Sequence, residues 1–412
     1  MKKLIKKLLR KNKYYKQYRK KKNTNNKIKL CTELSQTSEV NPKMVIFSVF
    51  SGRLYGCSPK AIYEYMIQQE EYKDFTFVWA FNKPDSKRDL FHDPRTELVK
   101  FNSNKFFEYL TQAKYWVFNF KTPEWFIKND QQVFVQCWHG TPLKKIGMDI
   151  EVNGNAATDI KDIHDSYIND AKKYDYFLSP STYATDRFVS SFGLNKLNKE
   201  NIVLEKGYPR NDSLFNKSEE EIDQIKENLG IEKGKKVLLY CPTFRDDQFK
   251  SGLGHTYQLG LNLLRLKEKL GKDYVLLLRL HYLISNNIDI SQFKGFAIDA
   301  SQYDDVNDLY LVSDVLITDY SSVFFDFANL HRPMIFYMYD LDKYQHNLRD
   351  FYIDIKELPG PIVESELDLI DTIKKVDEVS KQYEDQYASF CNTYTYLDDG
   401  KATERVVKEF IR

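Results

Sequence analysis

Short runs of consecutive apolar residues, each followed by a loop and a helical segment, constrain the fold of this chain more than any other feature. A continuous apolar run is typical of a parallel strand that is buried on both faces of a sheet. Runs of this kind occupy residues 44–50, 75–81, 114–120, 132–138, 175–179 and 202–205. A second series occupies residues 237–241, 274–280, 296–298, 315–318 and 334–337. Two such series predict an α/β fold of two doubly wound domains that face a cleft.

The segment between the two series sets the predicted domain boundaries. GYPRNDSLF (207–215) is rich in turn-forming residues and is expected to act as a hinge. Ser218, followed by three glutamates, predicts the capped start of the next helix. We therefore predict a basic tail over residues 1–40, a first domain over 41–210, a second domain over 211–375, and C-terminal helices over 376–412 that pack back on the first domain.

The basic residues are concentrated at the start of the chain. The first 30 residues contain 14 Lys or Arg and no acid, whereas the whole chain has a net charge of +2, so the remainder carries −12. Apolar residues recur at helical spacing among these lysines, which predicts a short amphipathic helix on an anionic membrane surface. A solvated tail and a nucleic-acid-binding arm are the alternatives, and the acidic body argues against nucleic acid. The residues assigned to the membrane are Lys2, Lys3, Leu4, Ile5, Lys6, Lys7, Leu8, Leu9 and Arg10.

Several classes of protein are disfavoured by what the chain lacks. No stretch approaches the roughly 20 uncharged apolar residues of a membrane-spanning helix. The five cysteines are scattered without a CxxC pair, which favours a reduced, cytosolic protein without a zinc knuckle or disulfide framework. No nucleophile elbow, P-loop or HExxH motif is present. Asp304 and Asp305 offer a metal site, but an acidic pair before a helix is more often a cap, so no metal is predicted.

One candidate site lies in VQCWHGTPLKKIG (135–147), where a predicted strand ends at His139. Thr141 is a good helix N-cap and Pro142 a good first helical residue, so a helix is expected to begin there. The free backbone N–H groups of a helix start attract anions, which assigns Gly140 and Thr141 to a phosphate. His139 would then be a base or a phosphate contact. The alternative is a core histidine bonded to a neighbouring loop.

Three strands of the second series also end in polar residues. YVLLLRLHY ends at His281, and VLLYCPTFRDD ends at Thr243 and Arg245, whose guanidinium fork suits phosphate oxygens. An ion pair of Arg245 with one of the next two aspartates is the alternative. VLITDYSSVFFDFANL ends at Asp319, after which two serines open a helix predicted over residues 323–330. Ser321 and Ser322 with the helix start would make a phosphate cradle, although capping alone would explain one serine.

Taken together, CWHGTPLKKIG, KGYPRND, YCPTFRDD, RLHY and TDYSSVFFDFANLHRPMIFYMYDLDKY, with FYIDIKELPGP after it, resemble the CDP-glycerol glycerophosphotransferases of teichoic acid synthesis. The resemblance extends over residues 44–390. It implies a GT-B fold of two Rossmann-like domains, with the nucleotide held mainly by the second. The family's two essential histidines correspond to His139 and His281. The resemblance also implies that Arg245, Ser321 and Ser322 meet the donor diphosphate.

The resemblance implies transfer of an alditol phosphate from CDP-glycerol or CDP-ribitol, with release of CMP and without a cofactor. The acceptor would be an undecaprenyl-diphosphate-linked saccharide or glycerophosphate, at the cytoplasmic membrane face. We assign His139 as the base because a histidine titrates near neutral pH, although the two histidines can exchange roles. Glycerol or ribitol, one unit or many, and wall polymer or capsule all stay open, as does the oligomeric state. A GT-B glycosyltransferase that uses a nucleotide sugar is the alternative function.

Overall fold

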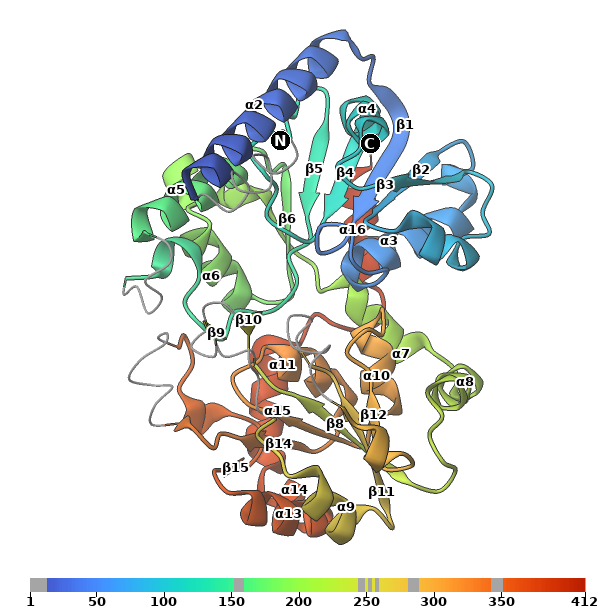
Figure 1. The fold of residues 1–412 in the computed structure, drawn as a ribbon, viewed down its shortest axis with the longest axis vertical. Helices are drawn as coiled ribbons and strands as arrows, with labels where there is room; N and C mark the ends of the chain where they lie inside the picture. The colour runs from blue at the N-terminus through green and yellow to red at the C-terminus, as the bar shows by residue number, and fades with distance from the viewer. Residues whose placement is uncertain are drawn as a thin grey trace, which may run out of the picture.

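Two parallel β-sheets, each covered by helices on both faces, form the two halves of the molecule (Figure 1). The computed structural model describes residues 13–151, 159–243, 249–250, 254–255, 259–280, 289–341 and 351–411. In Figure 1 the blue-to-green first half lies above the yellow-to-orange second half. The predicted fold class, with two doubly wound domains, is confirmed.

The first domain is built on seven parallel strands in the order β3-β2-β1-β4-β5-β6-β7. Its strands are β1 (Asn41–Ser48), β2 (Thr76–Phe81), β3 (Thr96–Lys100), β4 (Ala113–Phe118), β5 (Val133–Gln136), β6 (Tyr176–Ser179) and β7 (Val203–Glu205). Its helices are α2 (Lys13–Thr37), α3 (Cys57–Gln68), α4 (Asn104–Gln112), α5 (Ile160–Ala171) and α6 (Thr182–Ser191), with 3₁₀ turns η1 (Glu70–Tyr72), η2 (Pro84–Leu90), η3 (Gly147–Asp149), η4 (Asn195–Leu197) and η5 (Glu200–Ile202).

The second domain contains six parallel strands in the order β12-β11-β8-β13-β14-β15. They are β8 (Lys236–Cys241), β11 (Tyr274–Leu278), β12 (Ala297–Asp299), β13 (Val315–Thr318), β14 (Met334–Tyr337) and β15 (Ile362–Val363), beside a separate hairpin of β9 (Phe249–Lys250) and β10 (Gly254–His255). The helical elements are η6 (Pro209–Asp212), α7 (Ser213–Asn216), α8 (Glu219–Leu229), α9 (Leu263–Leu270), η9 (Ser291–Phe293), α10 (Val306–Val312), α11 (Val323–Phe327), η10 (Ala328–Leu330), η11 (Ile355–Glu357), α13 (Glu366–Lys374), α14 (Val376–Gln382), α15 (Glu384–Tyr394) and α16 (Ala402–Phe410).

Both sheets have the strand order of a nucleotide-binding fold, with the first strand of the domain in the middle and later strands added on either side. The order reverses between β1 and β4 in the first sheet and between β8 and β13 in the second. Ligands of such sheets bind beyond the carboxyl ends of the strands at this reversal. Residues that follow β1, β4, β8 and β13 are therefore the ones expected to line a site.

The central strands are buried on both faces, as their apolar runs predict. In each domain the two faces of the sheet belong to two separate clusters of buried side chains. Strands β3 and β15, each at a sheet edge, were not predicted. In β3 only Val99 is buried, so the sequence carries no continuous apolar run there.

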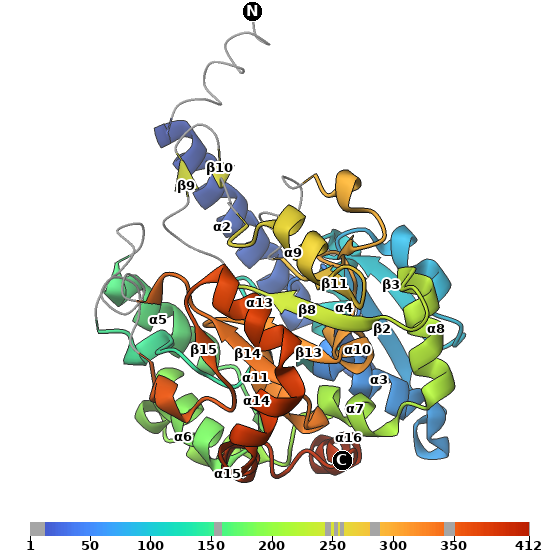
Figure 2. The ribbon, with the colours of Figure 1, turned by 90° about the horizontal axis from the view of Figure 1, so that it is seen from below.

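Part of the predicted tail belongs to the first domain, which corrects the predicted boundary at residue 40. Helix α2 runs across the first domain and projects beyond it (Figure 2). Cys31 is fully buried in the core of the first domain, and Leu30 and Leu34 pack beside it. These three residues lie on one side of the helix, so its second half docks against α4 and belongs to the domain. Residues 1–12, which include the predicted membrane-contacting residues, lie outside the described residues.

The C-terminal helices divide between the two domains. Phe390 and Tyr394 of α15 are buried in the core of the second domain, and Val376 at the start of α14 is buried there too. Only α16 enters the core of the first domain, through Val406, Val407 and Phe410. The prediction that residues 376–412 all pack back on the first domain therefore holds for α16, holds in part for α15, whose Tyr394 also packs against Tyr183 of α6, and is corrected for α14. The last helix makes the first domain discontinuous in sequence (Figure 1).

Candidate functional site

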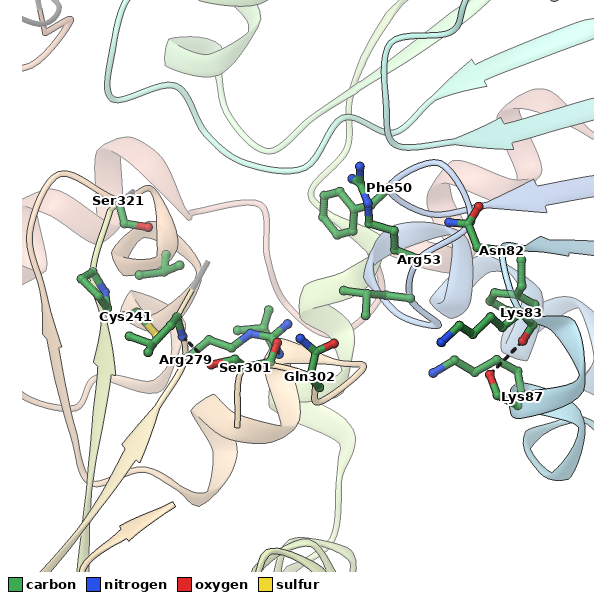
Figure 3. Close-up of a pocket in the computed structure, with 18 residues that line it drawn as sticks. Phe50, Arg53, Asn82, Lys83, Lys87, Cys241, Arg279, Ser301, Gln302 and Ser321 are labelled. Carbon is green, nitrogen blue, oxygen red and sulfur yellow. Dashed lines mark hydrogen bonds between the residues drawn. The ribbon is translucent and has the colours of Figure 1, made fainter. Parts of the chain in front are cut away.

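A cavity of about 670 Å³ lies between the two domains at the carboxyl ends of the strands (Figure 3). The first domain contributes the loop after β1 and the segment after β2. The second domain contributes the ends of β8 and β11, the loop after β12 and the start of α11. The site residues lining it are Phe50, Arg53, Asn82, Lys83, Lys87, Cys241, Arg279, Ser301, Gln302 and Ser321. The site therefore lies at the strand-order reversals of both sheets.

His139 lies three residues after the end of β5 at Gln136, and its ring packs against Phe50 in the cavity wall. The centroid of its ring lies 5.4 Å from that of Phe50, a residue that lines the cavity. Its Nδ1 lies 2.7 Å from the backbone oxygen of Asn119, which follows β4. Because a carbonyl oxygen only accepts, Nδ1 carries the proton and Nε2 holds the free lone pair. The imidazole is thus fixed in the tautomer that can take a proton at Nε2.

The surroundings of His139 favour the neutral ring. Burial by the surrounding protein lowers the pKa of His139 to about 4; the bond to Asn119 opposes this shift, and the charge of Arg210 adds to it. The side chain itself opens onto the cleft and is exposed there, so solvent moderates the shift without changing its direction. His139 is therefore unprotonated at pH 7, as a general base must be.

Asn119 is a functional residue that the sequence analysis missed. Its backbone oxygen accepts from His139, and its side-chain Oδ1 accepts from the backbone N–H of Phe50 at 2.8 Å. Phe50 has a φ of 46° and Trp138 a φ of 46°, both in the left-handed region that non-glycine residues rarely adopt. A single fully buried residue, Asn119, thus holds both the His139 ring and the strained backbone of Phe50. The sequence did contain one signal for Asn119, which is its position at the carboxyl end of a buried strand.

The helix expected to begin at Thr141 does not form, which corrects the basis of the Gly140 and Thr141 assignment. The chain from Thr141 to Ile146 is extended, and Lys144 forms an antiparallel bridge with Phe351 of the second domain. Leu143 is buried in the core of the second domain. The burial of Leu143 and the bridge between Lys144 and Phe351 both hold this segment in a non-helical conformation. No helix start therefore points at His139.

Gly140 instead brings the histidine loop against the start of α11. A Cβ atom at Gly140 would stand only 2.6 Å from Oγ of Ser322. Ser322 precedes α11 and makes no capping hydrogen bond to it, so its hydroxyl is not committed to the helix. Ser321 lines the cavity. The structure thus brings His139, Gly140 and the two serines together from opposite domains, as the prediction of converging strand ends requires.

Thr243 and Asp319 connect two neighbouring strand ends of the second domain. The carboxylate Oδ1 of Asp319 accepts from the backbone N–H of Thr243 at 2.8 Å and from that of Tyr320 at 2.6 Å. Asp319 is almost fully buried. These bonds give Asp319 the role of holding the loops after β8 and β13 in register, with Ser321 of the second loop lining the cavity.

Two predicted residues, Arg245 and His281, lie outside the described residues. The residues just before His281 are placed: Arg279 and Leu280 both line the cavity. The Nη1 of Arg279 donates to the backbone oxygens of Ala300, Ser301 and Tyr303, at 2.8, 3.0 and 2.6 Å. Arg279 therefore fixes the loop after β12, which forms one wall of the cavity.

The segment expected to be a hinge is instead a buried, fully bonded junction. Arg210 donates to both carboxylate oxygens of Asp326, at 3.1 and 2.8 Å. Asn211 donates to Asp326 and to Asp398, at 3.0 and 2.7 Å. Asp212 accepts from the first two backbone N–H groups of α16. The linker therefore joins the second domain to the last helix, and its buried charged and polar groups are paired with each other.

Asp304 and Asp305, predicted to be caps, also bridge the cleft. Asp305 does cap α10 by accepting from the backbone N–H of Asn307. Its other oxygen lies 2.8 Å from Nζ of Lys60 on α3, and Nζ of Lys87 lies 2.6 Å from an oxygen of Asp304. The two aspartates thus hold the cavity loop of the second domain against the first domain. Within the described ranges, no group of three His, Cys, Asp or Glu residues is placed to hold a metal ion.

Comparisons with known proteins show the family of the chain. A family model described as CDP-Glycerol:Poly(glycerophosphate) glycerophosphotransferase matches residues 30–411. A teichoic acid poly(glycerol phosphate) polymerase of Bacillus subtilis (strain 168) is 42% identical over 370 residues, which are 89% of this chain and 48% of that protein. The teichoic acid glycerol-phosphate transferase of Staphylococcus aureus (strain NCTC 8325 / PS 47) is 40% identical over 375 residues, 90% of this chain and 94% of that one. The chain spans about half the length of the Bacillus subtilis relative.

Solved structures show the same arrangement. The structure of the wall teichoic acid polymerase TagF superposes with a TM-score of 0.85 at 38% identity, over 96% of this chain and 98% of that chain. A UDP-GlcNAc 2-epimerase from Neisseria meningitidis, bound to UDP-GlcNAc, superposes with a TM-score of 0.52 at 12% identity, over 89% of this chain and 99% of that chain. At that identity the second likeness concerns the fold alone.

Proposed function

Since the chain belongs to the CDP-glycerol:poly(glycerophosphate) glycerophosphotransferase family, we propose that it transfers an alditol phosphate from a CDP-alditol to a lipid-linked acceptor and releases CMP. The observation that carries the proposal is the close approach of Gly140, the residue next to His139, to Ser322 of the second domain. Attack on a bound diphosphate requires a base for the acceptor hydroxyl and hydrogen-bond donors for the diphosphate oxygens. Here the first domain would supply the base and the second domain the donors.

The reaction follows from this geometry. Nε2 of neutral His139 takes the proton of the acceptor hydroxyl as its oxygen attacks the phosphorus that carries the alditol. The bond from that phosphorus to the oxygen bridging to CMP breaks, and the negative charge moves onto CMP. Ser321 and Ser322 would donate to the diphosphate oxygens as this charge develops. Arg245 and His281 enter this proposal on the sequence motifs, and the wall formed by Arg279 and Leu280 ends next to His281.

Glycerol is the favoured alditol. Four relatives named for glycerol phosphate are 39 to 42% identical over about nine-tenths of the chain, and a glycerol-phosphate primase is 34% identical over 73% of it. The relatives named for ribitol phosphate are 34 to 35% identical and cover 55 to 68% of it. One structure of TagF was soaked with CDPG, at a TM-score of 0.84 to this chain. We therefore propose CDP-glycerol as the first donor to test and CDP-ribitol as the second.

We also propose that the enzyme works at the cytoplasmic face of the membrane as a peripheral protein. No described helix has the length and hydrophobicity to cross a membrane. Support comes from α2, which projects beyond the body and carries exposed Tyr18, Arg19, Lys21 and Lys22 (Figure 2). A basic helix with aromatic residues binds anionic lipid surfaces. The acceptor is proposed to be the lipid-linked saccharide or glycerophosphate at that surface.

The test is to measure which nucleotide is released. The protein is incubated with CDP-glycerol, CDP-ribitol or a UDP-sugar together with a lipid-linked acceptor, and the nucleotide and product are separated. We expect CMP and a product extended by an alditol phosphate, and His139→Ala should lower the rate at least 100-fold because general-base catalysis contributes about 10²–10⁴. His92→Ala is the control, since His92 is exposed and outside the cavity lining. UDP release alone would instead establish the glycosyltransferase alternative.

A further inference from the structure

A buried ion pair joins the two domains next to the cavity, between Lys60 of α3 and Asp305 before α10. Nζ of Lys60 lies 2.8 Å from a carboxylate oxygen of Asp305, and the two side chains are only 14% and 11% exposed. Burial acts to lower the pKa of Lys60, but the negative charges of Asp305 and Glu64 outweigh it and hold the pKa above its usual value. Lys60 is therefore charged, and the pair is shielded from the solvent that weakens ion pairs at a protein surface.

The backbones of the two domains meet at the same place. The backbone N–H of Tyr55 donates to Oδ1 of Asp304 at 3.2 Å. A Cβ atom at Gly56 would lie only 3.0 Å from the backbone oxygen of Asp304. Nζ of Lys87 pairs with the carboxylate of Asp304. The start of α3 and the loop before α10 are thus in direct contact, with lysines on the first domain and aspartates on the second.

The loop that carries these aspartates also forms the cavity wall after β12. Ser301 and Gln302 of this loop line the cavity, as does Val306 in the first turn of α10 (Figure 3). Neither Lys60 nor Asp305 is among the described residues that line the cavity. A role of Lys60 in the reaction would therefore act through the position of this loop and not through contact with a substrate.

The ion pair connects the donor side of the cavity to the core that carries the base. Arg279 holds the loop after β12 from within the second domain, so the donor side keeps its shape without Lys60. Ile62 of α3 is buried in the same core of the first domain as Cys137, two residues before His139. Transfer requires the base of one domain to meet the diphosphate on the other, and a misplacement of about 1 Å can lower the rate about 10²-fold.

We propose that Lys60 is a positioning residue of the transfer reaction, because its ion pair with Asp305 sets His139 of the first domain in place against the donor held by the second domain. This inference rests on the proposed function. It predicts that loss of the pair lowers kcat and leaves the affinity for the donor unchanged. Lys87 and Asp304 form a second pair at the same contact, but Lys87 also lines the cavity, so Lys60 is the residue that separates positioning from direct contact.

The test uses substitutions that remove the charges and keep the shapes. Lys60→Met removes the ammonium, and Asp305→Asn removes the carboxylate charge while its side-chain oxygen can still cap α10. Each single variant leaves a buried charge unpaired, so the double variant, which removes both charges, is the one expected to keep full stability. The matched control is Lys217→Met with Asp308→Asn, which removes a pair of the same 2.8 Å length and similar burial within the second domain.

The measurements are kcat from CMP release and the Kd of CDP-glycerol from isothermal titration. We expect kcat to fall roughly 10- to 100-fold in the single and double variants, as for displacement of a catalytic group by about 1 Å, with the Kd within about twofold of the wild type. Lys60→Arg keeps the charge and should retain more of kcat than Lys60→Met. Hydrogen exchange at the backbone N–H of Tyr55 should become faster in the double variant, and this measurement needs no turnover.

Three results would overturn the inference. Unchanged kcat in the double variant would show that the pair serves stability alone. A tenfold rise in the Kd of CDP-glycerol at unchanged kcat would assign the pair to donor binding. An equal loss of kcat in the control with Lys217 and Asp308 substituted would show that joining the domains is not what matters. Absence of CMP release by the wild type would reject the proposed function, and the contact is then judged by Tyr55 alone, whose unchanged exchange in the double variant would reject it.

Discussion

The contact between Gly140 and Ser322 allows the proposed catalytic arrangement to be tested with one methyl group. In Gly140→Ala, the new Cβ would lie 2.6 Å from the Ser322 hydroxyl and 3.4 Å from its Cβ. Because that hydroxyl makes no capping bond to α11, it can rotate away without unfolding the helix. The substitution should thus remove the hydroxyl from the diphosphate site and leave the fold in place.

The magnitude follows from the contact that is lost. A hydrogen bond to a charged phosphate contributes about 1.5–3 kcal/mol, so KM for CDP-glycerol should rise roughly 10- to 100-fold. Ser322→Ala should have an effect of the same size. Because both changes remove one interaction, the double variant should be no worse than either single variant. Steady-state CMP release at saturating acceptor measures KM and kcat for all four proteins.

The double-mutant cycle also defines what would refute this reasoning. If the two effects on KM multiply, Gly140 and Ser322 do not act through the same atom. If Gly140→Ala lowers kcat with KM unchanged, the methyl acts on His139 instead. Gly230→Ala is the control, since nothing lies within 4 Å of its added methyl and its positive φ confines the expected effect to stability.

Three further predictions follow from the site and its supports. The pKa of His139 is lowered to about 4, so the base stays unprotonated as pH falls from 7, and kcat/KM should remain flat to about pH 5 and fall only below it; an acid limb near pH 6.5 would contradict this. Arg210→Ala leaves buried Asp326 without its cation and should lower the free energy of unfolding by about 3–5 kcal/mol, measured by urea denaturation. Removing the charge of exposed Arg88 should cause no measurable change. Deleting residues 1–22 should reduce sedimentation with anionic liposomes while CDP-glycerol binding is retained, and equal sedimentation of both proteins would reject the membrane role.

The sequence was sufficient to predict the fold because buried parallel strands leave an unambiguous pattern. The runs at 315–318 and 334–337 match β13 and β14 to the residue. The capping box at Ser218 formed as predicted. The edge strand β3 has only one buried residue and leaves no such run. Local patterns thus predicted the central strands and the edge strands β7 and β12, and missed the edge strands β3 and β15.

Long-range contacts explain what local patterns could not predict. Thr141 and Pro142 have the composition of a helix start, yet Leu143 is drawn into the core of the other domain and the helix does not form. In the same way, the sequence around Cys31 has the composition of a basic tail, and only the packing of its helix on the first domain places Cys31 in the core. Asn119 acts through its backbone oxygen, which no residue type reveals. Arg53 and Lys83 lie in ordinary loop sequence, and only the pairing of the two domains places them at one cavity.

The anchoring of Leu143 in the second domain has a mechanical consequence. His139 is attached on one side to β5 and on the other, only four residues later, to a side chain fixed in the opposite half of the molecule. Four residues span at most roughly 14 Å when fully stretched. The two halves therefore cannot swing wide apart without pulling the imidazole off its Asn119 support. His139 keeps its bond to Asn119 only while the two domains stay close together. Substrate binding between the domains and the readiness of His139 for proton transfer are therefore coupled through these four residues.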